Sequence, residues 1–577
     1  MAVSNRGASG SARFRARTRL LAAAFIVLAL ICIGRLYYVQ VMEGAAYTAK
    51  ADREFMTPSN PLFARGTIYM TTKDGAEIAA ATTESGVSLA LEPPLISDPE
   101  ALFNTLNAIT PLQKSTFLTD ATRSDTQYVV VADHLSTSTG ALIEAANATG
   151  TLVAEDAWRY YPGGSLAAET IGFVGYDGNT LNGRYGLERQ YETTLERQGG
   201  DLYTNFFVEL FAGVKNILSG NEEGDIITTI EPNVQEELER ELVLYDQEWH
   251  PQFDGGIIMD PQTGAIYAMA QTPTFDLNNY GAVTDQSLYS NLLVQNVYEM
   301  GSLIKSLTMA AGIDTGAVTA TTTYDDTPCI TVDTAQICNF DHRGRGVIPM
   351  QQVLSQSLNV GASFVATQLG PARMRNYFEN KFDLGTPTGI DLPTEAKGLI
   401  DNLNTNNQLY FDEASFGQGI AMTPIETIRA LDSIANGGYL VTPHLVSAIR
   451  TSSGISVPLS WPTGPQIIST TTSQILSQML TNVVDTQAED DIVKLDHWSI
   501  AAKTGTAQIA DPVHGGYIPN VYLHSYFGYF PSYDPRFIIF LLAYEPVGAP
   551  YSAETWGGIF HDLSTYLINY YNIPPDR

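Results

Sequence analysis

The chain has 577 residues, of which 44% are hydrophobic and 16% are charged, and its formal net charge is -31. This length exceeds what a single hydrophobic core supports, so we expect two or more domains. The negative charge argues against a nucleic-acid-binding protein, because such proteins present basic surfaces to phosphates. A negative charge is otherwise an ordinary feature of a folded exterior.

The N-terminus combines a basic tail with an apolar segment. Residues 1–19 contain five arginines and no acidic residue. The apolar residues 20–34 are short for a membrane helix of about 20 residues, but residues 35–41 extend the stretch with an arginine and two tyrosines. We therefore predict a transmembrane helix at 20–41, with 1–19 cytoplasmic and the rest of the chain outside the cell membrane. A cleaved signal peptide is the alternative, although no A-x-A site follows at the usual distance.

Residues 42–224 mix short β-like runs with polar turns. One such run is TQYVVVADHL, and Gly-rich turn sequences such as DGNTLNGRYG follow later. The pattern predicts an irregular, strand-rich module without long amphipathic helices. No nucleophile and base are grouped in it, so we predict no chemistry there.

A different pattern begins near residue 225. GDIITTI predicts a strand, and the acid- and leucine-rich run that starts at Pro232 predicts a helix. GGIIMD and AIYAMA, with PQTG between them, predict a strand, a turn and a strand. Further helices are predicted around Ser302 and at about 349–370, 423–436 and 556–572, and further strands at 500–510 and 526–545. Strands on both sides of a helical block predict one sheet with helices packed on it, an α/β (α+β) domain at 225–577.

Three cysteines are spread unevenly along the chain. Cys32 lies in the predicted membrane segment, whereas Cys329 and Cys338 lie in a loop-like stretch. Outside the membrane these two form either a disulfide or two unpaired thiols. The histidines are scattered, and neither C-x-x-C nor H-E-x-x-H occurs, so we predict no metal site.

Ser302 and Lys305 lie one helical turn apart in an otherwise apolar segment. At positions i and i+3 their side chains share one face, and Gly301 before them fits a helix start, where free N–H groups favour negative charge. A neutral lysine can take the proton of a serine hydroxyl, and apolar neighbours together with a second cation lower the lysine pKa. A helix with a snorkelling lysine is the alternative.

Ser357 and Asn359 lie two residues apart at a turn before an apolar helix. In this position the two side chains can simply cap the helix. The functional hypothesis makes Ser357 a proton relay and Asn359 an amide that fixes Lys305 or the substrate.

A third pattern, K-T-G-T, lies in a β-type run. Its residues are Lys503, Thr504, Gly505 and Thr506. The glycine lets another backbone approach, and an exposed strand edge can pair with an extended peptide. The lysine and the two hydroxyl groups suit a carboxylate. The alternative is a surface strand whose lysine prevents its edge from pairing with another chain.

Each pattern alone is weak, but their order along the chain is specific. S-x-x-K, then S-x-N 55 residues later, then K-T-G-T late in the chain is the motif set of penicillin-recognising serine enzymes. The chain resembles a class B penicillin-binding protein, a peptidoglycan transpeptidase, over about residues 35–572. Other segments that resemble the family are RLYYVQVMEGAAY, ARGTIY, KDGAEIA, RYYPGGSLAAETIGFVG, GRYGLERQYETTL, GGIIMDPQTGAIYAMAQTPTFDLN, PTGIDLPTEAKG and SFGQGIAMTPIETIRALDSIANGG.

The resemblance implies a mechanism and a set of site residues. Lys305 would deprotonate Ser302, which attacks the carbonyl between the two D-alanines of a stem peptide, and Ser357 would pass a proton to the leaving D-alanine. The backbone N–H groups of Ser302 and Thr506 would hold the oxyanion. The residues expected to be catalytic are Ser302, Lys305, Ser357, Asn359 and Lys503, and those expected to bind substrate are Thr504, Gly505 and Thr506.

The resemblance also implies an architecture and partners. It implies a transpeptidase domain at 225–577, preceded by an elongated β-rich pedestal or dimerisation module at 42–224 and by a single membrane helix. The expected ligands are peptidoglycan stem peptides ending in D-Ala-D-Ala and β-lactams, with no cofactor. The expected partners are a multi-spanning membrane glycan polymerase and other wall-synthesis proteins.

The chain departs from the family pattern at four positions near the motifs. Met300 replaces a usual proline, Leu303 and Ile304 replace a Ser/Thr and an aromatic residue, and Leu358 replaces a serine. None removes a reacting group, although they bear on β-lactam affinity. No glycosyltransferase signature lies near the anchor, which favours class B over class A. A β-lactamase or D,D-carboxypeptidase, and a non-catalytic scaffold of the wall-synthesis complex, are the alternative functions.

Overall fold

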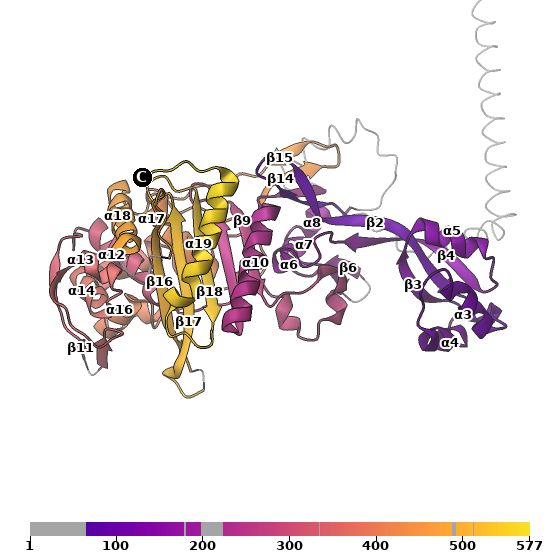
Figure 1. Cartoon of the computed structure of the whole chain (residues 1–577), viewed down its shortest axis with the longest axis horizontal. Coiled ribbons are helices and arrows are strands. Elements are labelled where there is room, and N and C mark those ends of the chain that lie inside the picture. Colours follow the sequence, from indigo (N-terminus) through magenta and orange to yellow (C-terminus); the bar gives the residue numbers. More distant parts are fainter. Residues whose placement is uncertain (1–64, 178–179, 198–222, 334, 487–491, 512) are drawn as a thin grey trace, which may run out of the picture. The chain divides into compact units, whose positions relative to one another are not determined.

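A computed structural model of the chain describes residues 65–177, 180–197, 223–333, 335–486, 492–511 and 513–577 (Figure 1). The described residues belong to two compact units. Unit 1 contains Glu84–Trp158, and unit 2 contains residues 65–83 and Arg159–Arg577. The predicted tail 1–19 and transmembrane helix 20–41 lie outside the described residues. Within the ranges given above, no helix is long and apolar enough to cross a membrane.

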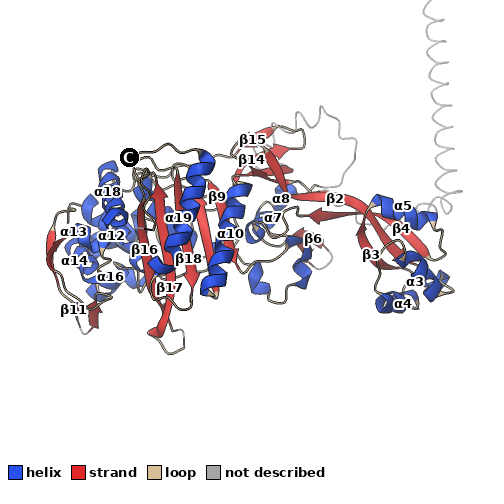
Figure 2. Ribbon diagram, in the orientation of Figure 1, coloured by secondary structure: helices blue, strands red, loops and turns tan. Residues whose placement is uncertain are grey.

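The centre of unit 2 is a five-stranded antiparallel sheet with the strand order β16-β17-β18-β8-β9 (Figure 2). Its strands are β8 (Phe253–Met259), β9 (Ile266–Thr272), β16 (Ala501–Ala510), β17 (Tyr517–Phe530) and β18 (Phe537–Tyr544). Helices cover both faces, so successive apolar side chains of one strand enter two different cores. Phe540 packs in one core and Leu541 in the other. The predicted sheet with helices packed on it is confirmed.

Two long helices cover one face of this sheet, namely α10 (Pro232–Trp249) and α19 (Ser552–Tyr571) (Figure 1). Pro232 occupies the first turn of α10, and the Glu231 side chain accepts a hydrogen bond from Val234 N, which is a normal helix start. Tyr245 of α10 stacks on Trp556 of α19 with ring centroids 3.7 Å apart. This aromatic contact joins the two helices over the sheet.

A larger helical layer covers the other face. It includes α12 (Ile304–Asp314), α13 (Met350–Ser355), α14 (Asn359–Leu369), α17 (Pro424–Ala435) and α18 (Thr470–Thr486). Every residue of α12 from Ile304 to Gly312 is buried, which explains why its sequence is apolar on nearly all sides. The helix predicted at 349–370 is two helices, because Ser357 adopts a φ of +53° between α13 and α14 and breaks the helical path.

Unit 2 contains a second sheet with the strand order β15-β14-β7-β1-β2. Its strands are β1 (Ile68–Thr71), β7 (Gly224–Thr228), β14 (Val446–Thr451), β15 (Ser456–Pro458) and the first half of β2 (Glu77–Leu91). Strand β7 pairs in parallel with β1 and antiparallel with β14. Segments that are far apart in the sequence therefore share one sheet.

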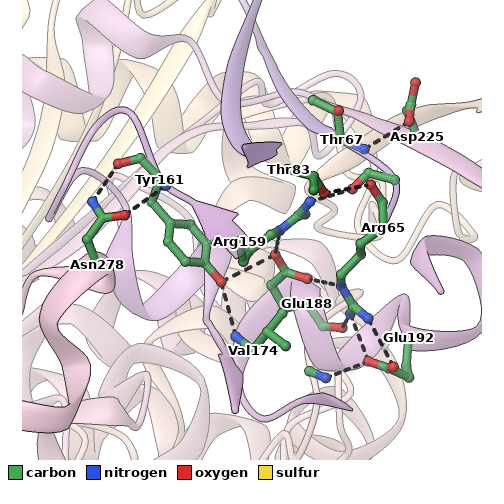
Figure 3. Close-up of polar contacts among 12 residues, drawn as sticks. Arg65, Thr67, Thr83, Arg159, Tyr161, Val174, Glu188, Glu192, Asp225 and Asn278 are labelled. Atoms are coloured by element: carbon green, nitrogen blue, oxygen red, sulfur yellow. Dashed lines mark hydrogen bonds and ion pairs between the residues drawn. The ribbon is translucent and has the colours of Figure 1, made fainter. Parts of the chain in front are cut away.

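A buried ion network joins three more segments of unit 2 (Figure 3). Arg65 Nε and Arg159 Nε each lie 2.6 Å from one carboxylate oxygen of Glu188, whose side chain is fully buried. Arg65 Nη2 also lies 2.7 Å from Glu192 Oε2. The network joins the segment 65–83 to the segment 159–197 within unit 2. The domain boundary at 224/225 stays a prediction, because residues 198–222 around it lie outside the described ranges.

We expect the substitution Glu188→Ala to lower the free energy of unfolding of unit 2 by about 3–5 kcal/mol, because it leaves two buried guanidinium groups without their shared partner. The matched control is Glu237→Ala, which removes an ion pair to the half-exposed Arg240 and should cost less than about 1 kcal/mol. Thermal and denaturant unfolding measure both changes. Equal losses in the two variants would contradict the structural role of the network.

Unit 1 is a small α+β module. The second half of β2 pairs antiparallel with β3 (Val129–Leu135), and β4 (Thr151–Tyr160) also pairs with β2. Three short helices contribute to its core, namely α3 (Pro99–Asn107), α4 (Lys114–Ala121) and α5 (Thr137–Ala145). The core includes Leu89, Leu106, Phe117 and Ile143. The sequence predicted the strands here and the lack of long helices, but not these helices of eight or nine residues.

Candidate active site

Ser302 lies in a short 3-10 turn, η5 (Gly301–Leu303), that leads directly into α12. Gly301 N donates a hydrogen bond to Gly417 O at 3.1 Å. A Cβ on Gly417 would lie 2.1 Å from Gly301 O, so only glycine allows the loop around residue 417 to approach the turn. The turn is thereby fixed, and it places the serine at the start of a buried helix.

Lys305 lies on the same face of the helix as Ser302. Its Nζ is 2.9 Å from Ser302 Oγ and 2.5 Å from Ser357 O, and the residue is 1% exposed. Burial, and after it the positive charge of Lys503, hold the pKa of Lys305 well below its ordinary value. The neutral amine that can take the Ser302 proton is therefore favoured by its surroundings.

Ser357 lies between the two lysines. Its Oγ is 3.2 Å from Lys305 Nζ and 3.1 Å from Lys503 Nζ. The backbone φ of +53° is strained for a serine, and in this conformation both the carbonyl and the hydroxyl oxygen reach Lys305. The structure thus brings together Ser302, Lys305, Ser357 and Lys503 from three separate segments of the chain.

Lys503 and Gly505 belong to β16, an edge strand of the five-stranded sheet. A Cβ on Gly505 would lie 2.6 Å from Met300 O and 3.0 Å from Leu303 Cγ. The close backbone approach expected at this glycine is present, and it brings β16 against the turn that carries Ser302. Because β16 is an edge strand, its outward backbone groups are not used by the sheet.

The threonines of K-T-G-T are half-buried, and each has a polar neighbour. Thr504 Oγ1 lies 3.5 Å from Lys503 Nζ. Thr506 Oγ1 accepts a hydrogen bond from Ser552 N, in the first turn of α19, at 3.2 Å. Since the Thr506 oxygen accepts this bond, its own O–H must be donated in another direction. The sequence did not indicate Ser552, because the contact spans 46 residues.

A proline at position 552 removes the N–H of this contact. Proline is tolerated at the first position of a helix, and Tyr551 before it is extended, as a residue before proline must be. We expect Ser552→Pro to slow acylation by a penicillin about fivefold relative to Ser552→Ala, because only the proline removes the N–H that orients Thr506. Both variants lose the serine hydroxyl, so their comparison reports the loss of the N–H together with the proline Cδ that takes its place beside Thr506. Equal acylation rates in stopped-flow measurements would contradict this role.

Asn359 is the first residue of α14. The sequence suggested that its amide fixes Lys305 or the substrate. In the structure Asn359 Nδ2 donates to the backbone oxygen of Cys338 at 2.9 Å. This partner was not predicted, since a backbone carbonyl leaves no signal in a sequence.

Two family models match the chain. The penicillin binding protein transpeptidase domain matches residues 255–564, and the penicillin-binding protein dimerisation domain matches residues 63–205. The first match covers more than half of the chain. The chain therefore belongs to the penicillin-binding protein transpeptidases, and the combination with a dimerisation domain makes it a class B member.

Individual relatives extend this similarity over most of the chain. Stage V sporulation protein D of Bacillus subtilis is 28% identical over 91% of this chain and 80% of its own length. Penicillin-binding protein PbpB of Mycobacterium tuberculosis is 26% identical over 99% of this chain and 87% of its own length. Among solved structures, penicillin binding protein 3 from Mycobacterium tuberculosis in complex with aztreonam has a TM-score of 0.65 and 25% identity over 73% of this chain and 92% of that one.

The four residues that depart from the family pattern lie in the core next to the site. Met300, Leu303, Ile304 and Leu358 are all fully buried. Their side chains therefore pack in the core, so these differences change the support of Ser302 and Ser357 rather than the reacting groups.

Proposed function

We propose that this protein is a serine-type peptidoglycan D,D-transpeptidase that cross-links stem peptides through an acyl-enzyme on Ser302. The observation that carries the proposal is the 2.9 Å contact between Ser302 Oγ and Nζ of the buried Lys305, whose pKa is held low by burial and by Lys503. Aztreonam and ampicillin are bound by the similar penicillin binding protein 3 from Mycobacterium tuberculosis. In this protein a β-lactam should acylate Ser302.

Acylation begins with a proton transfer within the site. Neutral Lys305 takes the hydroxyl proton of Ser302, whose oxygen attacks the carbonyl between the two D-alanines. The negative charge that develops on the carbonyl oxygen is held by the N–H groups of Ser302 and Thr506, an arrangement typically worth several kcal/mol. The close packing of β16 on the serine turn supports this pairing of donors.

The second half of the acylation releases D-alanine. Ser357 lies between Lys305 and Lys503, so a proton can pass from Lys305 through its hydroxyl to the leaving amine. Lys503, Thr504 and Thr506 attract the terminal carboxylate of the substrate. An amine from a neighbouring stem peptide then attacks the acyl-enzyme, which forms the cross-link and returns Ser302 to its free state.

The arrangement of the whole chain is part of the proposal. Residues 20–41 anchor the protein in the cell membrane with 1–19 in the cytoplasm, residues 42–224 form the pedestal and dimerisation module, and residues 225–577 form the transpeptidase domain outside the membrane. A multi-spanning glycan polymerase is the proposed membrane partner. The arginine-rich tail before an apolar run supports the orientation.

Labelling of the purified full chain by a fluorescent penicillin tests the activity. We expect a stable covalent adduct, and we expect release of D-alanine when a stem peptide ending in D-Ala-D-Ala and an acceptor amine are supplied. Absence of any adduct would favour a non-catalytic scaffold. A burst followed by rapid turnover of the penicillin would favour a β-lactamase.

A further inference from the structure

A disulfide-closed β-hairpin lies beside the active site. Its strands are β11 (Cys329–Val332) and β12 (Ala335–Cys338), which pair antiparallel with Cys329 opposite Cys338. The two sulfur atoms are bonded, which decides between the two alternatives that the sequence left open. Ile337 between them is 5% exposed and packs with Ala362 of α14. The hairpin is thus tied both to itself and to the helix that begins with Asn359.

The end of this hairpin holds the S-x-N segment through two hydrogen bonds. Cys338 O accepts from Asn359 Nδ2 at 2.9 Å, and Asn339 Oδ1 accepts from Val360 N at 3.2 Å. The first bond fixes the plane of the Asn359 amide, because an amide whose N–H₂ group is engaged has its oxygen on the opposite side. The position of one backbone carbonyl therefore sets the orientation of a proposed catalytic side chain.

Asn339 is itself held from the other side. It is 1% exposed, and its Nδ2 lies 3.1 and 3.2 Å from the two carboxylate oxygens of Asp326. Asn339 N also donates to Pro328 O at 3.0 Å. The disulfide holds Cys338, and the Asp326 carboxylate holds the next residue, Asn339. Breaking the disulfide therefore removes the covalent restraint on Cys338, while Asn339 keeps its contact with Asp326.

The next residue reaches the strand side of the site. The ring of Phe340 contacts that of Tyr551 edge-on, with centroids 5.7 Å apart. Tyr551 directly precedes Ser552, whose N–H orients Thr506. Residues 338–340 therefore lie next to two of the motifs. Cys338 bonds Asn359 of S-x-N directly, and Phe340 contacts Tyr551, whose neighbour Ser552 bonds Thr506 of K-T-G-T.

We propose that the Cys329–Cys338 disulfide is a positioning element of the active site, which fixes Cys338 O and through it the amide of Asn359. The proposal rests on the proposed function, because its effect is on the acylation of Ser302. Without the bond, the ends of β11 and β12 at Cys329 and Cys338 are held together by backbone hydrogen bonds, and the chain gains conformational freedom at the carbonyl. Activity is therefore coupled to the oxidation state of these two cysteines.

The first test compares the oxidised and the reduced full chain. A water-soluble phosphine breaks the S–S bond, and the phosphorus takes the oxygen of one water as phosphine oxide while both sulfurs become thiols. A chelator is included, since the thiols and His342 together could bind a metal ion. We expect the thiol count to rise by two and the rate constant for penicillin acylation to fall about five- to tenfold. Reoxidation should restore the rate.

The second test uses variants. The double variant Cys329→Ala/Cys338→Ala should acylate as slowly as the reduced protein and should not respond to the phosphine. We expect Asn359→Ala to acylate slowly by itself, and removing the disulfide in its background should slow it no further, because both changes break the same contact. Gln336→Ala, an exposed change on the same hairpin, is the matched control and should keep the wild-type rate.

The outcomes separate this inference from the proposed function. If the oxidised wild type forms no adduct, the proposed function is wrong. If it forms the adduct at the same rate before and after verified reduction, only the positioning role is wrong. Additive losses in the Asn359→Ala background, or loss of the folded state on reduction, would make the disulfide a general stabiliser and would also overturn the positioning role.

Discussion

Replacing Ser302 with alanine is expected to abolish covalent labelling by a fluorescent penicillin and to reduce the release of D-alanine by at least about 1,000-fold. Ser302 carries the hydroxyl that forms the acyl-enzyme in the proposed mechanism. Ser302 Oγ is the oxygen that lies 2.9 Å from Lys305 Nζ on the helix start, and Ser357 Oγ lies between two lysines in a position suited to passing a proton. Gel fluorescence after penicillin treatment measures the adduct.

The helix offers a matched control for this substitution. Ser306 lies four residues further along α12, is fully buried, and its Oγ has no hydrogen-bond partner. Ser306→Ala should therefore keep normal labelling and normal stability, because it removes a polar atom that is already unsatisfied. Persistent labelling of Ser302→Ala would show that the nucleophile is another residue and would end the proposed mechanism.

The reacting groups were predictable from the sequence because their chemistry resides in side-chain types at fixed spacing. Ser302 and Lys305 share a helix, so their contact follows from the helical repeat. The strands were predictable in the same way, since FIIFLLAY of β18 is apolar throughout and is covered on both faces. The helix of α10 likewise follows from Pro232 at its start.

Element ends were harder to predict where tertiary contacts decide them. Helix α19 begins at Ser552 instead of about 556, because Ser552 Oγ donates to Ser525 O on the sheet and fixes an additional turn there. Strand β17 begins at Tyr517 instead of 526, because its first half pairs with β16 as a hairpin. Pro519 and Asn520 interrupt the apolar run in that half, and both residues argue against a strand in a sequence pattern.

The supports of the site were not predictable at all. Cys338 holds Asn359 through a backbone oxygen, and Ser552 orients Thr506 through a backbone N–H, and every residue type carries these groups. The Arg65–Glu188 ion pair spans 123 residues and places the first described segment in unit 2. Such contacts depend on the folded path of the chain, and no local pattern in the sequence encodes them.

Replacing Lys305 with methionine is expected to slow penicillin acylation by about 100- to 10,000-fold, the usual contribution of a general base. Methionine matches the length and apolar surroundings of this fully buried side chain, so the fold should survive. Lys397→Met, at an exposed position, is the matched control and should keep the wild-type rate. The rate constant for formation of the penicillin adduct measures both.

The pH dependence of acylation separates the loss of a general base from a packing defect at position 305. The active form of Lys305 is neutral, and its pKa is lowered first by burial and then by the charge of Lys503. Wild-type acylation should therefore be high above this lowered pKa and should fall as the pH drops through it. Lys305→Met should lose that acidic decline along with most of its rate. An unchanged pH profile in the variant would show that another group takes the proton, and the pairing of Ser302 with Lys305 would then have no part in the chemistry.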